Sequence, residues 1–181
     1  VVIAPLPLYH IYAFTVHCMM LMLTGNHNVL ITNPRDLPAM IKDLGNWKFT
    51  GFVGLNTLFV ALCNNEEFRR LDFSGLKLTL SGGMALQLAA AERWKEVTGC
   101  AICEGFGMTE TSPVATVNPF SAIQLGTIGI PVPSTLCKIV NDDVQSAVDY
   151  ILGGFGQPDT EHPGRHDRHS AAFDQLQGDR R

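Results

Sequence analysis

The sequence has few charged residues and no excess of positive charge. Charged side chains make up 17% of the 181 residues, and 13 lysines and arginines stand against 17 aspartates and glutamates, which gives a formal net charge of −4. Nonspecific binding of nucleic acid depends on clustered positive charge, so we expect no nucleic-acid partner. Hydrophobic residues make up 46% of the chain, enough to bury a core, which excludes a wholly disordered protein.

The chain also lacks a long hydrophobic run, a secretory signal and an even set of cysteines. Its longest apolar stretch, residues 11–24, falls short of the roughly 20 residues that cross a bilayer. Five cysteines without a signal peptide favour reduced thiols in the cytosol. We therefore expect a cytoplasmic protein, in which Met19, Met20 and Met22 suit peripheral contact with the inner face of the membrane.

Short apolar strands alternate with helical patterns along the first two thirds of the chain. Strands are predicted at residues 1–6, 28–32, 49–53, 77–81 and 101–104. Helices are predicted at residues 10–23, 34–44, 56–63 and 86–97. Gly99 is expected to cap the last of these helices. We expect the helix at 34–44 to begin on an Asn33–Pro34 cap. This alternation predicts an α/β layered fold with mainly parallel strands.

Two glycine clusters fall where neighbouring predicted strands end. Gly82 and Gly83 follow one strand, and the next strand leads into the stretch Glu104-Gly105-Phe106-Gly107-Met108-Thr109-Glu110. The helix between them makes one βαβ crossover, which brings both clusters to the carboxyl edge of the sheet, where ligands bind in open α/β folds. Phe106 offers a face to a purine ring, Thr109 a hydroxyl to phosphate and Glu110 an oxygen ligand to Mg²⁺. An ordinary glycine-rich turn explains the spacing equally well.

Longer motifs resemble the adenylate-forming, AMP-binding enzymes. The stretch from Glu104 to Pro113 resembles their Y/F-G-x-T-E motif, and the stretch from Pro7 to Ala13 resembles their P-L-x-H motif. Stretches at residues 31–36, 56–59, 91–94 and 129–134 resemble bacterial long-chain fatty-acid–CoA ligases in particular. The resemblance covers about residues 1–143, and its motifs occur in the right order.

The resemblance implies an enzyme that uses ATP and Mg²⁺ to join a fatty acid to AMP, releasing pyrophosphate, before CoA displaces the AMP. It implies catalytic roles for His10, Thr109 and Glu110, with Glu110 as the Mg²⁺ ligand. It implies that nucleotide and substrate are bound by Gly82, Gly83, Glu104, Gly105, Phe106, Gly107, Met108 and Thr109. It further suggests a homodimer for the full-length enzyme.

Other parts of the family pattern are missing from these 181 residues. The Ser/Thr/Gly-rich phosphate loop, the ribose-binding aspartate and the C-terminal lysine have no match. The chain begins at Val1, and the family pattern stops after Asp143. We therefore expect an internal fragment that is inactive by itself: a partial AMP-binding domain at 1–143 and a divergent tail at 144–181, disordered from about Gly153.

Two alternatives remain open from the residues alone. A chain without the phosphate loop is also consistent with a nucleotide-binding module that performs no chemistry. Cys100 and Cys103 form a C-x-x-C match that would suit a thiol or metal protein. Because this match falls within a predicted strand, we expect the two side chains on opposite faces of the sheet. The histidines at 162, 166 and 169 are expected to be solvated rather than to bind metal.

Overall fold

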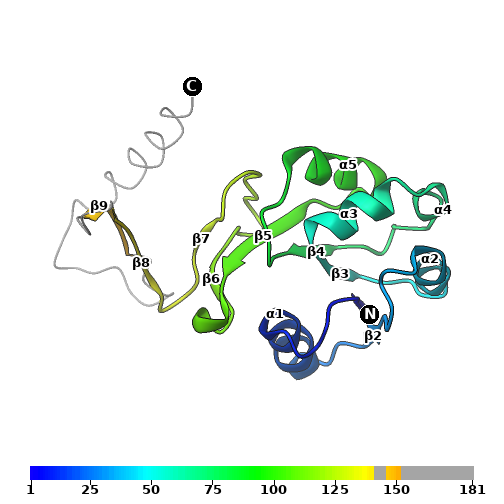
Figure 1. Cartoon of the computed structure of the whole chain (residues 1–181), viewed down its shortest axis with the longest axis horizontal. Coiled ribbons are helices and arrows are strands. Elements are labelled where there is room, and N and C mark those ends of the chain that lie inside the picture. The colour runs from blue at the N-terminus through cyan, green and yellow to red at the C-terminus, as the bar shows by residue number, and fades with distance from the viewer. Residues whose placement is uncertain (141–145, 152–181) are drawn as a thin grey trace. The chain divides into compact units, whose positions relative to one another are not determined.

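The protein is represented by a computed structural model that describes residues 1–140 and 146–151. The chain divides into two compact units, Val1–Val132 and Pro133–Arg181. The first unit is a β-sheet with helices packed on its two faces (Figure 1). The described part of the second is an antiparallel pair of strands.

The first unit is built on a seven-stranded sheet with the order β2-β1-β3-β4-β5-β6-β7. The strands are β1 (Val2–Ala4), β2 (Asn28–Leu30), β3 (Gly51–Gly54), β4 (Leu78–Ser81), β5 (Ile102–Gly107), β6 (Val114–Val117) and β7 (Ile130–Pro131). Strands β2, β1, β3, β4 and β5 pair in parallel, whereas β5, β6 and β7 pair antiparallel. The prediction of an α/β fold with a mainly parallel sheet is confirmed.

Side chains of the parallel strands alternate between two hydrophobic cores, one on each face. On β1, β3 and β5, the residues Ile3, Phe52 and Ile102 pack in the first core. Their neighbours Val2, Val53 and Cys103 pack in the second core. This alternation is the period-2 pattern of a sheet that is covered on both faces.

Different helices cover the two faces (Figure 1). The first core receives side chains from α2 (Leu37–Gly45), α3 (Asn56–Cys63), α4 (Glu66–Arg69) and α5 (Leu88–Thr98). The second receives Tyr12, Val16 and Leu21 from α1 (Ile11–Ala13) and the π-helix η1 (Phe14–Leu21). A helix was predicted here, but the change to π-helical hydrogen bonding after Ala13 was not.

Trp94 on α5 anchors the first core. It is fully buried, and its ring lies 5.2 Å from that of Phe52 and 4.8 Å from that of Phe59. Its indole N–H donates to the Thr79 hydroxyl at 3.1 Å, so the one polar atom of the side chain is satisfied. The aromatic contacts fix α5 and α3 against the sheet, and thereby the loop that leads into α5.

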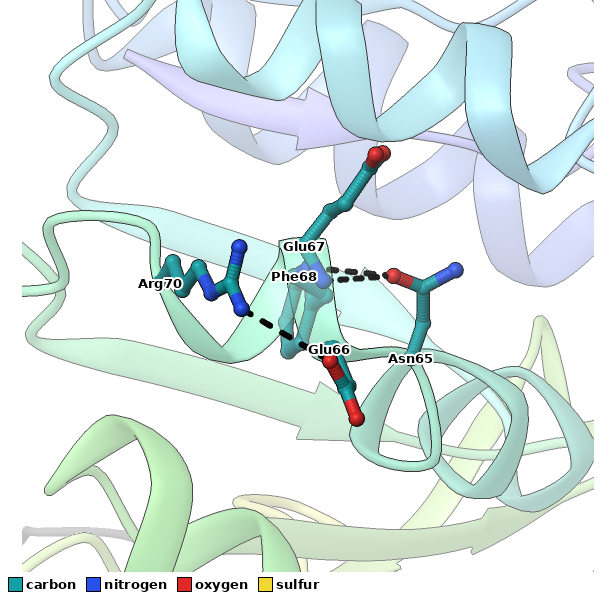
Figure 2. A network of polar contacts seen from close by, with 5 residues as sticks. All are labelled: Asn65, Glu66, Glu67, Phe68 and Arg70. Atoms are coloured by element: carbon teal, nitrogen blue, oxygen red, sulfur yellow. Dashed lines mark hydrogen bonds and ion pairs between the residues drawn. The ribbon is translucent and has the colours of Figure 1, made fainter.

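Helix α4 was missed by the sequence analysis because it is a single turn with no apolar period. Asn65 caps it, accepting from the backbone N–H groups of Glu67 at 2.8 Å and Phe68 at 3.3 Å (Figure 2). The Arg70–Glu66 ion pair, at 3.6 Å, is exposed and adds little stability. Phe68 is fully buried, with its ring 5.6 Å from that of Trp94, so the turn serves to place this ring.

The predicted start of α2 and the predicted end of β5 were wrong. Helix α2 begins at Leu37 on an Asp36 cap, whose carboxylate accepts from Ala39 N–H at 3.1 Å, and not on Asn33–Pro34. Asn33 instead accepts from Arg35 N–H at 3.3 Å and closes a turn. Strand β5 runs on to Gly107, three residues past the predicted end, because β6 pairs with its second half.

The second unit contains β8 (Leu136–Val140) and β9 (Ser146–Ile151), which pair antiparallel with Cys137 opposite Tyr150. Strand β9 lies within the range 144–181 that the sequence analysis assigned to the tail. The expectations of disorder from Gly153 and of solvated histidines at 162, 166 and 169 concern positions outside the described residues.

Candidate functional site

The predicted site residues come together because three parallel strands end at one edge of the sheet. Strand β1 leads to His10, β4 ends directly before Gly82, and β5 leads to Thr109. These strands belong to one parallel array, with β3 between β1 and β4. Their carboxyl ends therefore face the same way, which is the ligand-binding edge of open α/β sheets.

A surface hollow of about 440 Å³ lies at this edge. Its lining includes both His10 and Thr109, two residues predicted as catalytic from separate motifs. The remaining lining residues are mostly apolar: Leu8, Tyr9, Ile11 and Phe14. The hollow thus combines an apolar wall with an imidazole and a hydroxyl, which suits a ligand that has an apolar part and a polar end.

The His10 side chain has a defined role at the start of α1. Its Nδ1 accepts a hydrogen bond from the backbone N–H of Tyr12 at 3.2 Å and so caps the helix. Accepting at Nδ1 places the proton of the neutral ring on Nε2. The ring is exposed, and its Nε2–H is a hydrogen-bond donor for an oxygen atom of a ligand.

Thr109 and Glu110 lie in a short 3₁₀ turn, η2 (Thr109–Thr111), and both are exposed. The Thr111 hydroxyl fixes the turn: it accepts from Met108 N–H at 2.8 Å and donates to the Pro113 carbonyl at 2.6 Å. The side chains of Thr109 and Glu110 take no part in this network, whereas the Thr109 carbonyl accepts from Ser112 N–H at 3.3 Å. The side-chain oxygen atoms thus remain available to a ligand while the backbone beneath them is held.

The glycines of the two clusters meet different requirements. A Cβ on Gly107 would collide with the Pro113 carbonyl, so the close approach of the strand to the turn needs glycine. A Cβ on Gly82 would lie 3.2 Å from the Tyr12 ring. Gly83 has a φ of +80° and open space around its Cβ position, so the backbone conformation rather than packing favours glycine there.

The remaining predicted residues follow the same edge without lining the hollow. Phe106 is 44% exposed and Met108 51% exposed, so both reach solvent. Among the described residues, the lining of the hollow does not include Gly82, Gly83, Glu104, Gly105, Phe106, Gly107, Met108 or Glu110. Of the predicted site residues, His10 and Thr109 therefore line the hollow, and the others lie along the same edge of the sheet outside it.

Glu104 turns inward. It is 7% exposed, and its Oε1 accepts from the backbone N–H of Leu86 at 2.9 Å. Burial raises the pKa of this carboxyl, and the hydrogen bond from Leu86 partly opposes that shift. The sequence offered a signal of this arrangement, since Glu104 shares its face of β5 with Ile102, and a carboxyl in an apolar strand needs a partner.

Two buried hydroxyls near the glycine turn escaped the sequence analysis. The hydroxyl of Tyr12, whose ring backs Gly82, and the hydroxyl of Ser81 have no hydrogen-bond partner within the described part of the chain. Burial raises the pKa of Tyr12, so its hydroxyl stays protonated at physiological pH. Buried polar groups usually find a partner, so both are candidates to bind water or a polar ligand atom.

Glu110 could coordinate Mg²⁺ only if a bound nucleotide supplied further oxygen ligands. No group of three or more His, Cys, Asp or Glu side chains that could hold a metal occurs among residues 1–140 and 146–151. Mg²⁺ is commonly held by one or two carboxylates with phosphate oxygens and water completing its octahedron. An exposed single carboxylate beside the Thr109 hydroxyl suits this arrangement.

Cys100 and Cys103 do not form a paired thiol site. Cys100 packs in the first core and Cys103 in the second, so they lie on opposite faces of the sheet as predicted. The Cys103 thiol donates to the Asn118 carbonyl at 3.0 Å, and burial raises its pKa to about 11. Both cysteines are therefore core residues.

None of the described helices is both long and apolar enough to span a bilayer.

A mainly parallel α/β sheet with glycine-rich turns at its carboxyl edge is typical of ligand-binding enzymes, and comparison with known proteins specifies the family. Residues 1–150 match the family described as AMP-binding enzyme. The chain belongs to this family.

Curated relatives point to one branch of the family. The chain is 50% identical over 143 residues to the long-chain-fatty-acid–CoA ligase of Escherichia coli O6:H1, covering 78% of this chain and 26% of the relative. It is 50% identical over 146 residues to the ligase of the same name from Haemophilus influenzae, covering 80% of this chain and 26% of the relative. The chain thus spans about a quarter of the length of these relatives.

Solved structures show the same fold. The anthranilate CoA ligase AuaEII, in complex with anthranoyl-AMP, matches with a TM-score of 0.73 and 25% identity over 81% of this chain and 29% of its own. A benzoate CoA ligase from Burkholderia xenovorans matches with a TM-score of 0.73 and 22% identity over 95% of this chain and 36% of its own.

Proposed function

We propose that this chain forms part of the adenylation site of a long-chain fatty-acid–CoA ligase. Such an enzyme joins a fatty acid to AMP from ATP, releases pyrophosphate and then transfers the acyl group to the CoA thiol. The observation that carries the proposal is the hollow shared by His10 and Thr109, with its apolar wall. The relatives at 50% identity support the choice of a long-chain fatty acid over other carboxylic acids.

The proposed roles follow from the chemistry of each exposed group. The Nε2–H of His10 hydrogen-bonds an oxygen of the reacting carboxylate, while Tyr9, Ile11 and Phe14 contact the adjoining apolar chain. The Thr109 hydroxyl donates to a phosphate oxygen. Phe106 stacks on adenine, and the glycine backbone at Gly82, Gly83, Gly105 and Gly107 lets the ligand approach closely.

Attack of a carboxylate on the α-phosphate builds negative charge on the phosphate oxygens. Fixed hydrogen-bond donors stabilise that charge best when they need no rearrangement, which the locked η2 turn provides for Thr109. Glu110 would hold Mg²⁺, and the ion would supply additional stabilisation of the charge on the phosphate.

A chimera provides the test. The 143 residues aligned with the E. coli ligase replace their counterparts in that enzyme, and the product is assayed with ATP, Mg²⁺, CoA and palmitate. We expect fatty-acid-dependent AMP and acyl-CoA. A folded, soluble chimera that binds neither ATP nor fatty acid would overturn the proposal. The 181-residue chain alone should give no AMP, because most of the groups that position the phosphates are absent from it.

Three further features remain proposals. Peripheral membrane contact is supported by a group of exposed apolar side chains on or directly after η1: Phe14, Met19, Met20, Met22 and Leu23. Flotation of the chimera with vesicles of anionic phospholipid, compared with a Met19→Ser, Met20→Ser variant, tests this contact. The homodimer and the cytoplasmic location stay predictions.

A further inference from the structure

Glu104 is the last residue through which β5 is tied to the segment that carries Gly82 and Gly83. The parallel pairing of β4 and β5 ends with Ser81 opposite Glu104. Beyond this pair the backbone of β5 turns to β6, with Gly105 opposite Val117. Among the described residues, the hydrogen bond that joins β5 to residues 82–87 runs from Leu86 N–H to the Glu104 carboxylate, at 2.9 Å.

The same segment is held from a second side by α3. Gln87 is the N-cap residue of α5, and its own side chain makes no capping hydrogen bond. Its backbone N–H donates instead to Asn56 Oδ1 at 2.9 Å. Two adjacent N–H groups before α5 are thus satisfied by buried side chains from other elements, Glu104 from β5 and Asn56 from α3.

The backbone of Glu104 joins a third segment. Its carbonyl accepts from Asn118 N–H at 2.9 Å and from the Asn118 side-chain amide at 3.3 Å. Glu104 therefore connects the glycine turn after β4 with the end of β6, and it is followed directly by the Gly105–Glu110 motif. A shift of this residue would move both glycine clusters relative to each other.

We propose that Glu104 is a positioning residue that sets the spacing between the Gly82–Gly83 turn and the Gly105–Glu110 segment through its bond to Leu86 N–H. The inference rests on the proposed function, since it assigns the two segments to one ligand site. In this role Glu104 touches backbone and not ligand, which differs from the direct binding role that its place in the motif implies.

The bond requires an oxygen acceptor rather than a negative charge. Leu86 contributes one neutral N–H, and burial already disfavours the ionised carboxyl. Glutamine presents an amide oxygen with the same reach, so Glu104→Gln should keep the spacing. Leucine has a similar size and no acceptor, so Glu104→Leu should leave the buried Leu86 N–H unpaired.

Amide hydrogen exchange of the 181-residue chain, without ligand, tests the proposal. Glu104→Leu should exchange on the order of 10-fold faster both at Leu86 and across residues 105–108, while α2 and β1 stay as in the parent. Glu104→Gln should restore parent rates. The matched control Asn56→Ala should speed exchange at Gln87 and leave residues 105–108 unchanged.

Three results would overturn the proposal: faster exchange in Glu104→Leu confined to Leu86, a uniform increase over the whole chain, or a Glu104→Gln variant that behaves like Glu104→Leu. The uniform increase would show a general contribution to folding rather than to the spacing of the two segments. Because the measurement uses no ligand, its failure is distinct from failure of the chimera assay.

Discussion

His10 and Thr109 line the same hollow although one follows the first strand of the chain and the other follows β5. Their meeting depends on the parallel array, in which β1 pairs with β3, β3 with β4 and β4 with β5. The hollow is therefore a product of topology, and a local motif alone could not have produced it.

The Thr109 hydroxyl gives the first prediction. In the chimera, Thr109→Val should lower the rate of acyl-adenylate formation by about 10- to 100-fold, because a valine of similar shape cannot donate to phosphate. Thr109→Ser keeps the hydroxyl and should recover most of the rate. Thermal unfolding should be unchanged in both, since Thr109 is exposed. Equal rates for valine and serine would show that the hydroxyl has no part in the reaction.

The second prediction is that the buried His17 makes the protein less stable toward unfolding in mild acid. Its Nδ1 donates to Asn28 Oδ1 at 2.8 Å, the Asn28 amide donates back to the His17 carbonyl at 3.1 Å, and its Nε2 is buried without a partner among the described residues. Burial lowers the pKa of His17 below its usual 6.5. The neutral ring therefore stabilises the fold above pH 6.5, and this contribution is lost as the pH falls through the lowered pKa.

The check is the melting temperature of the 181-residue chain between pH 7.5 and 5. His17→Asn places an amide donor where Nδ1 was and cannot titrate, so its melting temperature should fall less than that of the parent over this range. Each kcal/mol corresponds to about 2–4 °C in a chain of this size. Parallel pH profiles for the two proteins would contradict the assignment.

Thiol accessibility supplies a third prediction. Burial raises the pKa of Cys63 and of Cys103 to about 11, whereas Cys18 and Cys137 are partly exposed. At pH 7.5, iodoacetamide should label Cys18 and Cys137 first, and Cys63, Cys100 and Cys103 only after unfolding. Peptide mass mapping over time measures the order. Early labelling of Cys103, or a Cys100–Cys103 disulfide, would mean that the two cores do not separate these residues.

The sequence predicted best those elements whose pattern is local and periodic. Helix α3 has the predicted bounds, and α5 ends at Gly99, whose φ of +74° is the expected left-handed cap. The placement of the motif residues at one edge of the sheet was predicted because these residues follow parallel strands. In each of these cases the residues themselves carry the signal, with little help from distant parts of the chain.

The features that the sequence analysis missed depend on distant partners. Gly105 and Gly107 are poor strand formers, and they extend β5 only because β6 pairs with them. The start of α2 is an exception, because its cause is local: a helix that began on the predicted Asn33–Pro34 cap would place Pro38 in its interior, whereas the Asp36 cap leaves Pro38 in the first turn, where proline is tolerated. The inward turn of Glu104 depends on Leu86, which belongs to another element.

ATP–pyrophosphate exchange measures adenylation alone, so it isolates the step assigned to this site from the later transfer to CoA. The chimera is compared with its Glu110→Gln variant, which keeps the side-chain shape and removes the anionic ligand for Mg²⁺. We expect palmitate-dependent exchange in the chimera and a fall on the order of 10²-fold in the variant. Exchange at the parental rate in Glu110→Gln would contradict the role of Glu110 as a Mg²⁺ ligand.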